Sequence, residues 1–441
     1  MEYTYEEAAD YISRIPRFTS KNTPEDTRLF YEHLGCPGEG RRIVHVAGTN
    51  GKGSVCAYVD SVLRCAGIRT GFFSSPHLVD IRERFRLNGE LMPEEDFAAC
   101  FNRVMEECFL FREKSGRKEY HPTFFEILFF MGMLWFEKKD VQAIVLETGL
   151  GGRLDATNVI ARPSVCVITR IGLDHMEYLG DTKPLIAAEK AGIIKPGVPV
   201  VCWEQEPEVN RVLAGTAQEK GAKRISVSER DVLGYQFQNK TVAFSMHSEY
   251  YEYIKVCLHT SAVYQRENAA LAVRALEALQ EEGGPALTRC QIEKGLSLAH
   301  WEGRMEELLP GVMVDGAHNE DGIEAFLDSV SRDGCRGKRA LLFSVVSDKR
   351  AAEMAERILD SGLFNEITAT SLETDRRLGE QELMALWRGR ARWQTPPEEA
   401  LARLIREKGE DDFVYAAGSL YLAGQLLGWY RRKGEENNVG F

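Results

Sequence analysis

The residues with the clearest chemical potential form a glycine-rich run at 45–54, which reads His-Val-Ala-Gly-Thr-Asn-Gly-Lys-Gly-Ser. An apolar, β-branched stretch leads into this run, and a helical pattern at 55–66 follows it. A strand, a glycine-rich turn and a helix in this order direct backbone N–H groups and a helix N-terminus at a phosphate. Lys52 adds a positive charge for the outer phosphates, so the run predicts a nucleoside triphosphate site.

The spacing of the glycines leaves an alternative open. The run is shorter than the standard phosphate loop, G-x-x-x-x-G-K-[ST]. By itself, a glycine-rich turn with one lysine is also compatible with an ordinary turn. The flanking strand and helix patterns, together with motifs farther along the chain, favour the phosphate site.

Two metal-ligating side chains follow strand patterns in the first half of the chain. Glu147 comes directly after an apolar run at 143–146, and His175 follows another at 165–169. Carboxyl ends of parallel strands meet at one edge of a sheet, which is where open α/β sheets bind ligands. We therefore expect a Mg²⁺ ligand in Glu147 and a metal role for His175. The alternatives are a solvated strand end for Glu147 and a hydrogen-bonded loop residue for His175.

Other polar residues give weaker signals. Lys190 ends a helical pattern, and composition alone predicts an ordinary solvated lysine. Asp315 and His318 follow a short strand pattern and could hydrogen-bond a ligand, or merely a tight turn of their own. Arg304 is suited to a bidentate phosphate contact, or is an ordinary surface charge.

The elements that must position these residues alternate along the first two-thirds of the chain. This alternation predicts an α/β fold with a mostly parallel sheet covered by helices, and residues 225–258 are expected as antiparallel strands at its margin. A helix is expected at 265–281. The expected strands are 42–46, 70–73, 143–146, 165–169 and 198–202, and the expected helices are 55–66, 93–114, 122–138 and 184–191.

A second αβ series begins near residue 312, with expected strands at 312–314, 340–345, 366–370 and 413–416. We place the domain boundary near 298–303. The prediction is an N-terminal ATP-binding domain at 1–298 and a smaller Rossmann-like C-terminal domain at 299–441.

Composition narrows the class of protein. The chain has 441 residues and a net charge of −12, which argues against general binding to nucleic acid or to an anionic membrane. No apolar run reaches membrane length, and the acidic N-terminus lacks the pattern of a signal peptide, so we expect a cytoplasmic protein. The ten cysteines include no C-x-x-C pair and are expected to be buried thiols.

Taken together, the motifs closely resemble the folylpolyglutamate synthase and dihydrofolate synthase family of the Mur ligase superfamily. The C-terminal motifs match more loosely, and Thr148 and Glu302 depart from the usual valine and proline. The segments that carry the resemblance occur in the family's order at 45–54, 74–78, 81–84, 147–158, 173–175, 189–192, 303–306, 315–319 and 418–421.

The resemblance implies roles for individual residues on the nucleotide side. It implies ATP phosphates on Thr49, Asn50, Gly51, Lys52, Gly53 and Ser54, an adenine contact at Asn268, and contacts to phosphate and ribose at Arg304 and Asp315. It implies a pair of Mg²⁺ ions held by Ser75, Glu147 and His175. It leaves open whether K⁺ is a further cofactor. Lys190 matches a lysine that family members carbamylate, which would turn a cation into an oxygen ligand.

On the acceptor side, the resemblance implies a pterin or folate site lined by Thr123, Phe124, Phe125, Glu126, Leu154, Asp155 and Ala156. His318 and Ser419 match the glutamate side. The implied catalytic set is Lys52, Glu147, His175, Lys190 and His318.

The implied activity is ATP-dependent ligation of L-glutamate to a reduced folate or to dihydropteroate through an acyl phosphate, by a monomer. One alternative is a Mur-type ligase acting on another carboxylate, which a binding screen of folates against UDP-sugar precursors would separate. The other is a P-loop regulator that binds ATP without ligating, which amino-acid-dependent phosphate release would rule out.

Overall fold

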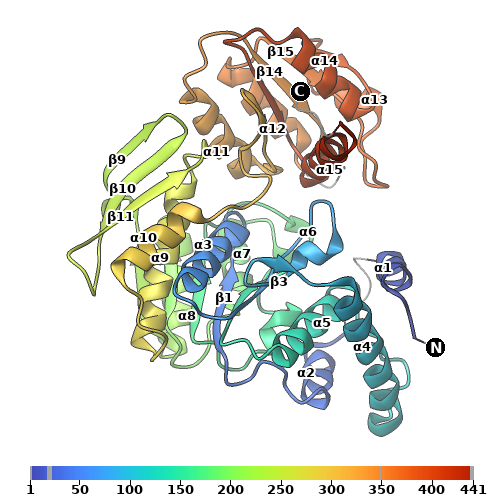
Figure 1. Ribbon diagram of the computed structural model, residues 1–441, viewed down its shortest axis with the longest axis vertical. Coiled ribbons are helices and arrows are strands. Elements are labelled where there is room, and N and C mark those ends of the chain that lie inside the picture. Colours follow the sequence, from blue (N-terminus) through green and yellow to red (C-terminus); the bar gives the residue numbers. More distant parts are fainter. Residues whose placement is uncertain (1, 17–21, 348, 438–441) are drawn as a thin grey trace.

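The strands that the structure describes form three sheets, two in the N-terminal part and one in the C-terminal part (Figure 1). The structure is a computed structural model that describes residues 2–16, 22–347 and 349–437. Over these residues it is an α/β protein with mainly parallel sheets, as the alternating patterns predict.

The largest sheet has eight strands in the order β4-β3-β2-β5-β1-β6-β7-β8. All strands from β2 to β8 in this order are parallel, and β3 and β4 form an antiparallel edge. The five strands expected for this region are confirmed. Their apolar, β-branched residues are buried, as suits a parallel sheet covered on both faces. The bounds are β1 (Arg42–Ala47), β2 (Thr70–Phe73), β3 (Phe85–Leu87), β4 (Glu90–Leu91), β5 (Ala143–Glu147), β6 (Val165–Ile168), β7 (Val200–Trp203) and β8 (Arg224–Val227).

Helices cover both faces of this sheet. One face packs against α3 (Lys52–Cys65), α9 (Gln265–Glu281) and α10 (Arg289–Leu298). The other face packs against α4 (Glu94–Ser115) and α5 (Phe124–Lys138) at one end, and α7 (Lys183–Ala191) and α8 (Pro207–Glu219) at the other. The remaining helical elements are α1 (Tyr5–Arg14), α2 (Pro24–His33), α6 (Met176–Leu179) and the short 3-10 turns η1 (Ile81–Arg84), η2 (Ala156–Val159) and η3 (Glu229–Asp231).

The expectation for residues 225–258 is wrong at its beginning. Strand β8 pairs in parallel with β7 and extends the large sheet. The unpredicted helix α8 lies between these two strands, and such a crossover makes the next strand parallel. The antiparallel sheet contains β9 (Leu233–Gln238), β10 (Thr241–His247) and β11 (Tyr253–His259).

The C-terminal sheet has six strands in the order β12-β13-β17-β14-β15-β16. All four strands expected here are present, while β12 and β16 were not anticipated. One face packs against α11 and α12, and the other against α14 and α15. The bounds are β12 (Glu306–Leu309), β13 (Val312–Val314), β14 (Arg339–Phe343), β15 (Glu366–Ala369), β16 (Ala391–Trp393), β17 (Phe413–Ala417), α11 (Glu320–Ser331), α12 (Ala351–Ser361), α13 (Glu380–Ala385), α14 (Pro397–Glu407) and α15 (Leu420–Asn437).

Three smaller expectations can be compared with the fold. Helix α5, expected at 122–138, is present and is buried along most of its length. Among the described helices, none is both long and apolar enough to cross a membrane. The cysteines are free, and the expectation of buried thiols holds for only half of them. Cys290 is exposed and four others are only partly buried, namely Cys36, Cys65, Cys257 and Cys335. The proposed boundary at 298/299 falls at the end of α10 and stays a prediction.

Candidate active site

A cavity of about 1350 Å³ lies between the carboxyl edge of the eight-stranded sheet and the C-terminal part of the chain. The structure brings all the site residues singled out in the sequence to this cavity, although they come from distant segments. They are Thr49, Asn50, Gly51, Lys52, Gly53, Ser54, Ser75, Thr123, Phe124, Phe125, Glu126, Glu147, Leu154, Asp155, Ala156, His175, Lys190, Asn268, Arg304, Asp315, His318 and Ser419.

The glycine-rich run forms a tight loop between β1 and α3. Gly51 precedes α3 with φ 92°, and no side chain caps the first N–H groups of that helix. These N–H groups remain available to an anion, which the helix dipole also favours. Glycine is required here by close contacts, since a Cβ at Gly48 would lie 1.7 Å from Thr169 Oγ1 and one at Gly51 would lie 2.2 Å from Asn268 Oδ1. The geometry fits a phosphate cradle better than an ordinary turn.

Glu147 ends β5 beside this loop and is only 3% exposed, so the alternative of a solvated strand end is wrong. Its Oε2 accepts a hydrogen bond of 3.0 Å from the Ser75 N–H, and its Oε1 lies 4.0 Å from Lys52 Nζ. Burial raises the pKa of Glu147, with the charge of Lys52 and the Ser75 N–H opposing it. A buried carboxylate that faces a cavity with so little compensation is suited to a cation.

His175 stands after β6, at the beginning of α6, with φ 50°. Burial lowers its pKa to about 4, so the imidazole is neutral near pH 7 and can coordinate a metal. No cluster of three or more His, Cys, Asp or Glu ligands occurs among the residues that the structure describes. The set implied for Mg²⁺ does not need one, because it includes the Ser75 hydroxyl, and Mg²⁺ keeps several waters of its own. The donors present therefore fit Mg²⁺, whereas nothing in the described residues argues for K⁺.

Lys190 is buried, so the composition-based expectation of a solvated lysine is wrong. Its Nζ donates a 2.8 Å hydrogen bond to the Gly48 carbonyl beneath the phosphate loop. Burial, and then the charge of Lys52, lower the pKa of Lys190 to about 7. The cause is tertiary, since the segment around Gly152 packs on the end of α7: a Cβ there would lie 2.7 Å from the Lys190 carbonyl oxygen.

Asp315 links the two parts of the chain at the end of β13. Its Oδ2 accepts hydrogen bonds from the Tyr264 hydroxyl at 2.7 Å and from the Met305 N–H at 2.9 Å. Its Oδ1 accepts from the Ala317 N–H at 2.7 Å. The tight-turn alternative thus describes part of what Asp315 does, although the residue also lines the cavity.

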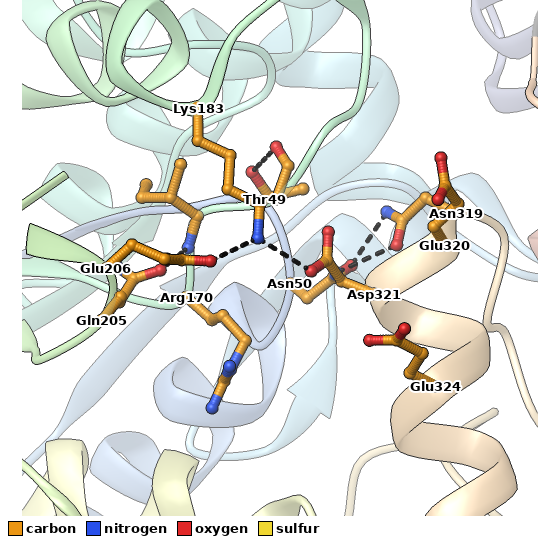
Figure 2. A network of polar contacts seen from close by, with 12 residues as sticks. Thr49, Asn50, Arg170, Lys183, Gln205, Glu206, Asn319, Glu320, Asp321 and Glu324 are labelled. Atoms are coloured by element: carbon orange, nitrogen blue, oxygen red, sulfur yellow. Dashed lines mark hydrogen bonds and ion pairs between the residues drawn. The ribbon is translucent and has the colours of Figure 1, made fainter. Parts of the chain in front are cut away.

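The beginning of α11 contacts the phosphate loop directly, as Figure 2 shows. The amides of Asn50 and Asn319 exchange hydrogen bonds of 3.0 and 3.1 Å. Beside them, Lys183 Nζ lies 2.7 Å from Glu206 Oε1 and 3.3 Å from Asp321 Oδ1, and so ties α7 to both α11 and the segment before α8 (Figure 2). This polar contact holds the C-terminal part against the nucleotide side of the cavity.

Sequence reasoning missed the most heavily bonded carboxylate of this contact, Asp174. It pairs with Lys349, lies 3.4 Å from His318 Nε2, and accepts a 3.1 Å hydrogen bond from Asn319. Burial opposes its charge, but the hydrogen bond from His318 and the neighbouring positive charges outweigh burial and hold the pKa of Asp174 well below its ordinary value. The only indication in the sequence that Asp174 belongs to the site was its position next to His175. Lys349 lies 175 residues away in the sequence, so its pairing with Asp174 could not be predicted.

The acceptor side of the cavity combines aromatic side chains with carboxylates that hydrogen-bond to the chain. Phe125 packs so closely on Gly149 that a Cβ there would lie 2.6 Å from the ring. Glu126 accepts hydrogen bonds from the Thr123 N–H and Asn22 Nδ2, both at 2.7 Å, and from Thr27 Oγ1 at 2.5 Å. In this structure Glu126 therefore joins the N-terminal segment to α5 as well as lining the cavity.

The two residues assigned to the glutamate side line the cavity from the C-terminal part. The His318 imidazole contacts the Gly316 carbonyl through Nδ1 at 2.7 Å. Ser419 is buried after β17, and its hydroxyl accepts a 3.1 Å hydrogen bond from the Tyr421 N–H. Both positions are thus fixed by local hydrogen bonds at the end of a strand.

Comparison with known proteins agrees with this architecture. Residues 46–276 match the family model "Mur ligase middle domain", and residues 303–420 match "Mur ligase, glutamate ligase domain". The dihydrofolate synthase/folylpolyglutamate synthase of Bacillus subtilis (strain 168) is 33% identical, over 96% of this chain and 98% of that protein. The folylpolyglutamate synthase of Lacticaseibacillus casei is 31% identical, over 96% and 97%.

Solved structures show the same similarity. The apo form of L. casei FPGS has a TM-score of 0.82 at 28% identity and covers 96% of this chain and 98% of its own. E. coli FolC in complex with DHPP and ADP has a TM-score of 0.83 at 27% identity and covers 98% of each chain.

Proposed function

The chain belongs to the folylpolyglutamate synthase and dihydrofolate synthase family of Mur ligases, and from this premise we propose how its cavity performs the family's reaction. It is an ATP-dependent ligase that joins L-glutamate to a folate-type carboxylate. The observation that supports the assignment of its residues is that the uncapped phosphate loop, the buried Glu147 and the acceptor-side aromatics share one cavity.

The first step activates the carboxylate of the acceptor. A carboxylate is a poor electrophile, so one of its oxygens attacks the γ-phosphorus of ATP, the bond to the β-phosphate oxygen breaks, and an acyl phosphate and ADP result. The N–H groups at the start of α3 and the Lys52 ammonium stabilise negative charge on the phosphate oxygens. Mg²⁺, held by Ser75, Glu147 and His175, would supply further positive charge to those oxygens.

The second step forms the amide. The neutral α-amine of L-glutamate attacks the acyl carbon, inorganic phosphate leaves, and the amine loses its proton. No protein nucleophile is required, so positioning supplies most of the catalysis. We assign the incoming glutamate to His318 and Ser419 and the pterin to the Thr123–Glu126 and Leu154–Ala156 segments, which line the same cavity. The contact around Asn50, Lys183 and Asp321 keeps the two sides together and limits the entry of water.

Lys190 is proposed to carry a carbamate. Only the neutral amine adds to CO₂, and a buried lysine whose pKa is about 7 is about half neutral at pH 7, whereas an ordinary lysine is almost wholly protonated there. Addition forms an N–C bond and releases one proton, which leaves an anionic oxygen ligand near the phosphate loop. Mass spectrometry of the intact protein should show the gain of one CO₂ in bicarbonate buffer, and Lys190→Met should lose it.

All the site residues assigned above come from one chain, and we therefore propose that the protein acts as a monomer. Light scattering coupled to size exclusion should give the mass of one chain. A dimer that is fully active only as a dimer would contradict this part of the proposal.

The decisive experiment measures phosphate release with ATP, Mg²⁺ and L-glutamate, using a reduced folate and dihydropteroate as separate acceptors. Omission of glutamate controls for simple ATP hydrolysis. Release with both acceptors identifies a bifunctional enzyme, and release with the folate alone identifies a dedicated polyglutamate synthase. Silence with both acceptors contradicts the folate assignment and redirects the search to other Mur-type carboxylates.

A further inference from the structure

A buried polar side chain in β1 has no role in the reaction described above. His45 lies three residues before Gly48 and is fully buried, although its neighbours in β1 are apolar except for Arg42 at the strand's start. Its Nε2 lies 2.8 Å from the Thr157 hydroxyl oxygen, and Thr157 is also fully buried. A buried imidazole costs free energy that an aliphatic residue at this position would avoid, so the contact with Thr157 calls for an explanation.

Thr157 passes this contact on to Asp155. The Thr157 hydroxyl donates to Asp155 Oδ1 at 2.6 Å, and the Thr157 N–H donates to the same oxygen at 3.0 Å. The other oxygen, Oδ2, accepts from the Gly149 N–H at 2.9 Å and the Leu150 N–H at 2.8 Å. Asp155 therefore fastens the segment that follows β5, and this segment lines the acceptor side of the cavity.

The direction of these hydrogen bonds fixes the tautomer of His45. The single hydroxyl proton of Thr157 is already donated to Asp155, so Thr157 Oγ1 can only accept from His45. Nε2 must then carry the proton, and Nδ1 is the bare nitrogen. No described residue offers a hydrogen bond to Nδ1, which agrees with an imidazole anchored from one side only. Burial and the charge of Lys195 lower the pKa of His45 to about 3, so the ring stays neutral.

We propose that His45 is a positioning residue for the folate-side acceptor, acting through Thr157 and Asp155. The inference rests on the proposed function, because it names the substrate side that the chain of hydrogen bonds serves. His45 belongs to the strand that ends in the phosphate loop, while Asp155 holds the segment that faces the acceptor. One imidazole thus fixes the acceptor segment relative to the phosphate that it must meet.

The first test compares two replacements of His45. His45→Val keeps a strand-forming, apolar side chain but removes the donor, and His45→Gln keeps an amide N–H near the position of Nε2. We expect His45→Val to raise the KM for the folate acceptor by about fivefold to twentyfold, as for loss of one buried hydrogen bond, while the KM for ATP changes by less than about twofold. His45→Gln should recover most of the loss.

A second pair of variants makes the test independent of how well His45→Val folds. Thr157→Val should give the same rise in the KM for the acceptor, and Thr157→Ser, which keeps the hydroxyl, should not. The double variant His45→Val/Thr157→Val should be no worse than Thr157→Val alone, because both changes break one chain of contacts. Ile43→Val is the matched control, since it trims a buried residue on the same face of β1 without touching the polar contacts.

The outcomes separate this inference from the function on which it rests. Equal rises in the KM for ATP and for the acceptor, a lower Tm with unchanged KM, or no recovery with His45→Gln would each overturn the positioning role while the wild type remains an active ligase. A wild type without ligase activity on either acceptor overturns the proposed function and this inference together.

Discussion

Replacing Lys190 with methionine should stabilise the protein while inactivating it. The Lys190 side chain is almost completely buried, and its pKa falls from an ordinary value of 10.5 to about 7 because burial disfavours the charged form. In the unfolded chain the same amine is protonated at neutral pH. Folding must therefore remove a proton that the unfolded state would keep, and this costs free energy that methionine does not incur.

The size of the effect follows from the difference between the two pKa values. Each unit is worth about 1.4 kcal/mol, so the cost is about 5 kcal/mol at pH 7 and below, and it disappears as the pH rises toward 10.5. The free energy of unfolding of the wild type therefore rises as the pH increases from about 7 to about 10.5. The Gly48 carbonyl loses its donor in the variant, which returns about 1 kcal/mol. At about pH 7.5 the variant should be more stable by roughly 3 kcal/mol.

Urea denaturation of both proteins, in buffer freed of CO₂ so that no carbamate forms, measures this difference. Between about pH 7.5 and about pH 9 the advantage of Lys190→Met should shrink by about 2 kcal/mol, since all other titrating groups are common to both proteins. The variant should also show no amino-acid-dependent phosphate release. An advantage that does not vary with pH, or a variant less stable than the wild type at every pH, would refute the assignment of a depressed pKa to Lys190.

Three other perturbations give separate expectations. Lys52→Ala should reduce ligation, measured by phosphate release, by at least about a hundredfold and leave the Tm unchanged, with Lys138→Ala as the surface control. Near-normal ligation by Lys52→Ala would contradict the assignment of Lys52 to the phosphate site. Asp321→Asn should raise the KM for ATP by only about twofold to fivefold and make this KM less sensitive to salt, because Lys183 keeps Glu206 as a partner. An effect as large as that of Lys52→Ala would contradict a supporting role for the Lys183–Asp321 ion pair. Chelation of divalent cations should stop phosphate release and added Mg²⁺ should restore it, while Glu147→Gln should require more Mg²⁺; full activity in the chelator would exclude the metal site.

Local patterns in the sequence were sufficient to predict the strands that position the site. The strand before the phosphate loop and the one that ends in Glu147 are short apolar runs, and their order with intervening helices predicts parallel pairing. Because parallel strands end at one edge, the register that sets Val46 opposite Glu147 also brings the phosphate loop and the carboxylate together. The shared cavity of these residues was therefore predictable without knowledge of the rest of the fold.

The environment of each residue was less predictable, because it depends on segments distant in the sequence. Lys190 looks like a solvated helix end until the chain around Gly152 covers it. Asp174 becomes a centre of charge only when the C-terminal part supplies His318 and Lys349. The antiparallel pairing predicted for β8 was wrong because helix α8, which precedes this strand, was not recognised in the sequence. In each case the local sequence is ordinary, and contacts with distant segments determine the burial, charge environment or strand pairing of the residue.

Three acidic residues of the cavity show why contact with a ligand cannot be inferred from placement alone. Asp155 accepts four hydrogen bonds from its own segment, and Asp315 accepts three at the end of β13. Glu126 accepts two from the N-terminal segment and one from the N-cap residue of its own helix α5. Each carboxylate therefore shapes the wall of the cavity whether or not it also binds substrate. Substitution by alanine removes both roles at once, so a loss of activity does not identify a binding residue. A rise in one KM with an unchanged Tm indicates that the carboxylate serves the site of that substrate, by contact or by positioning, whereas a fall in Tm with a uniform loss of activity indicates that it holds the wall in place.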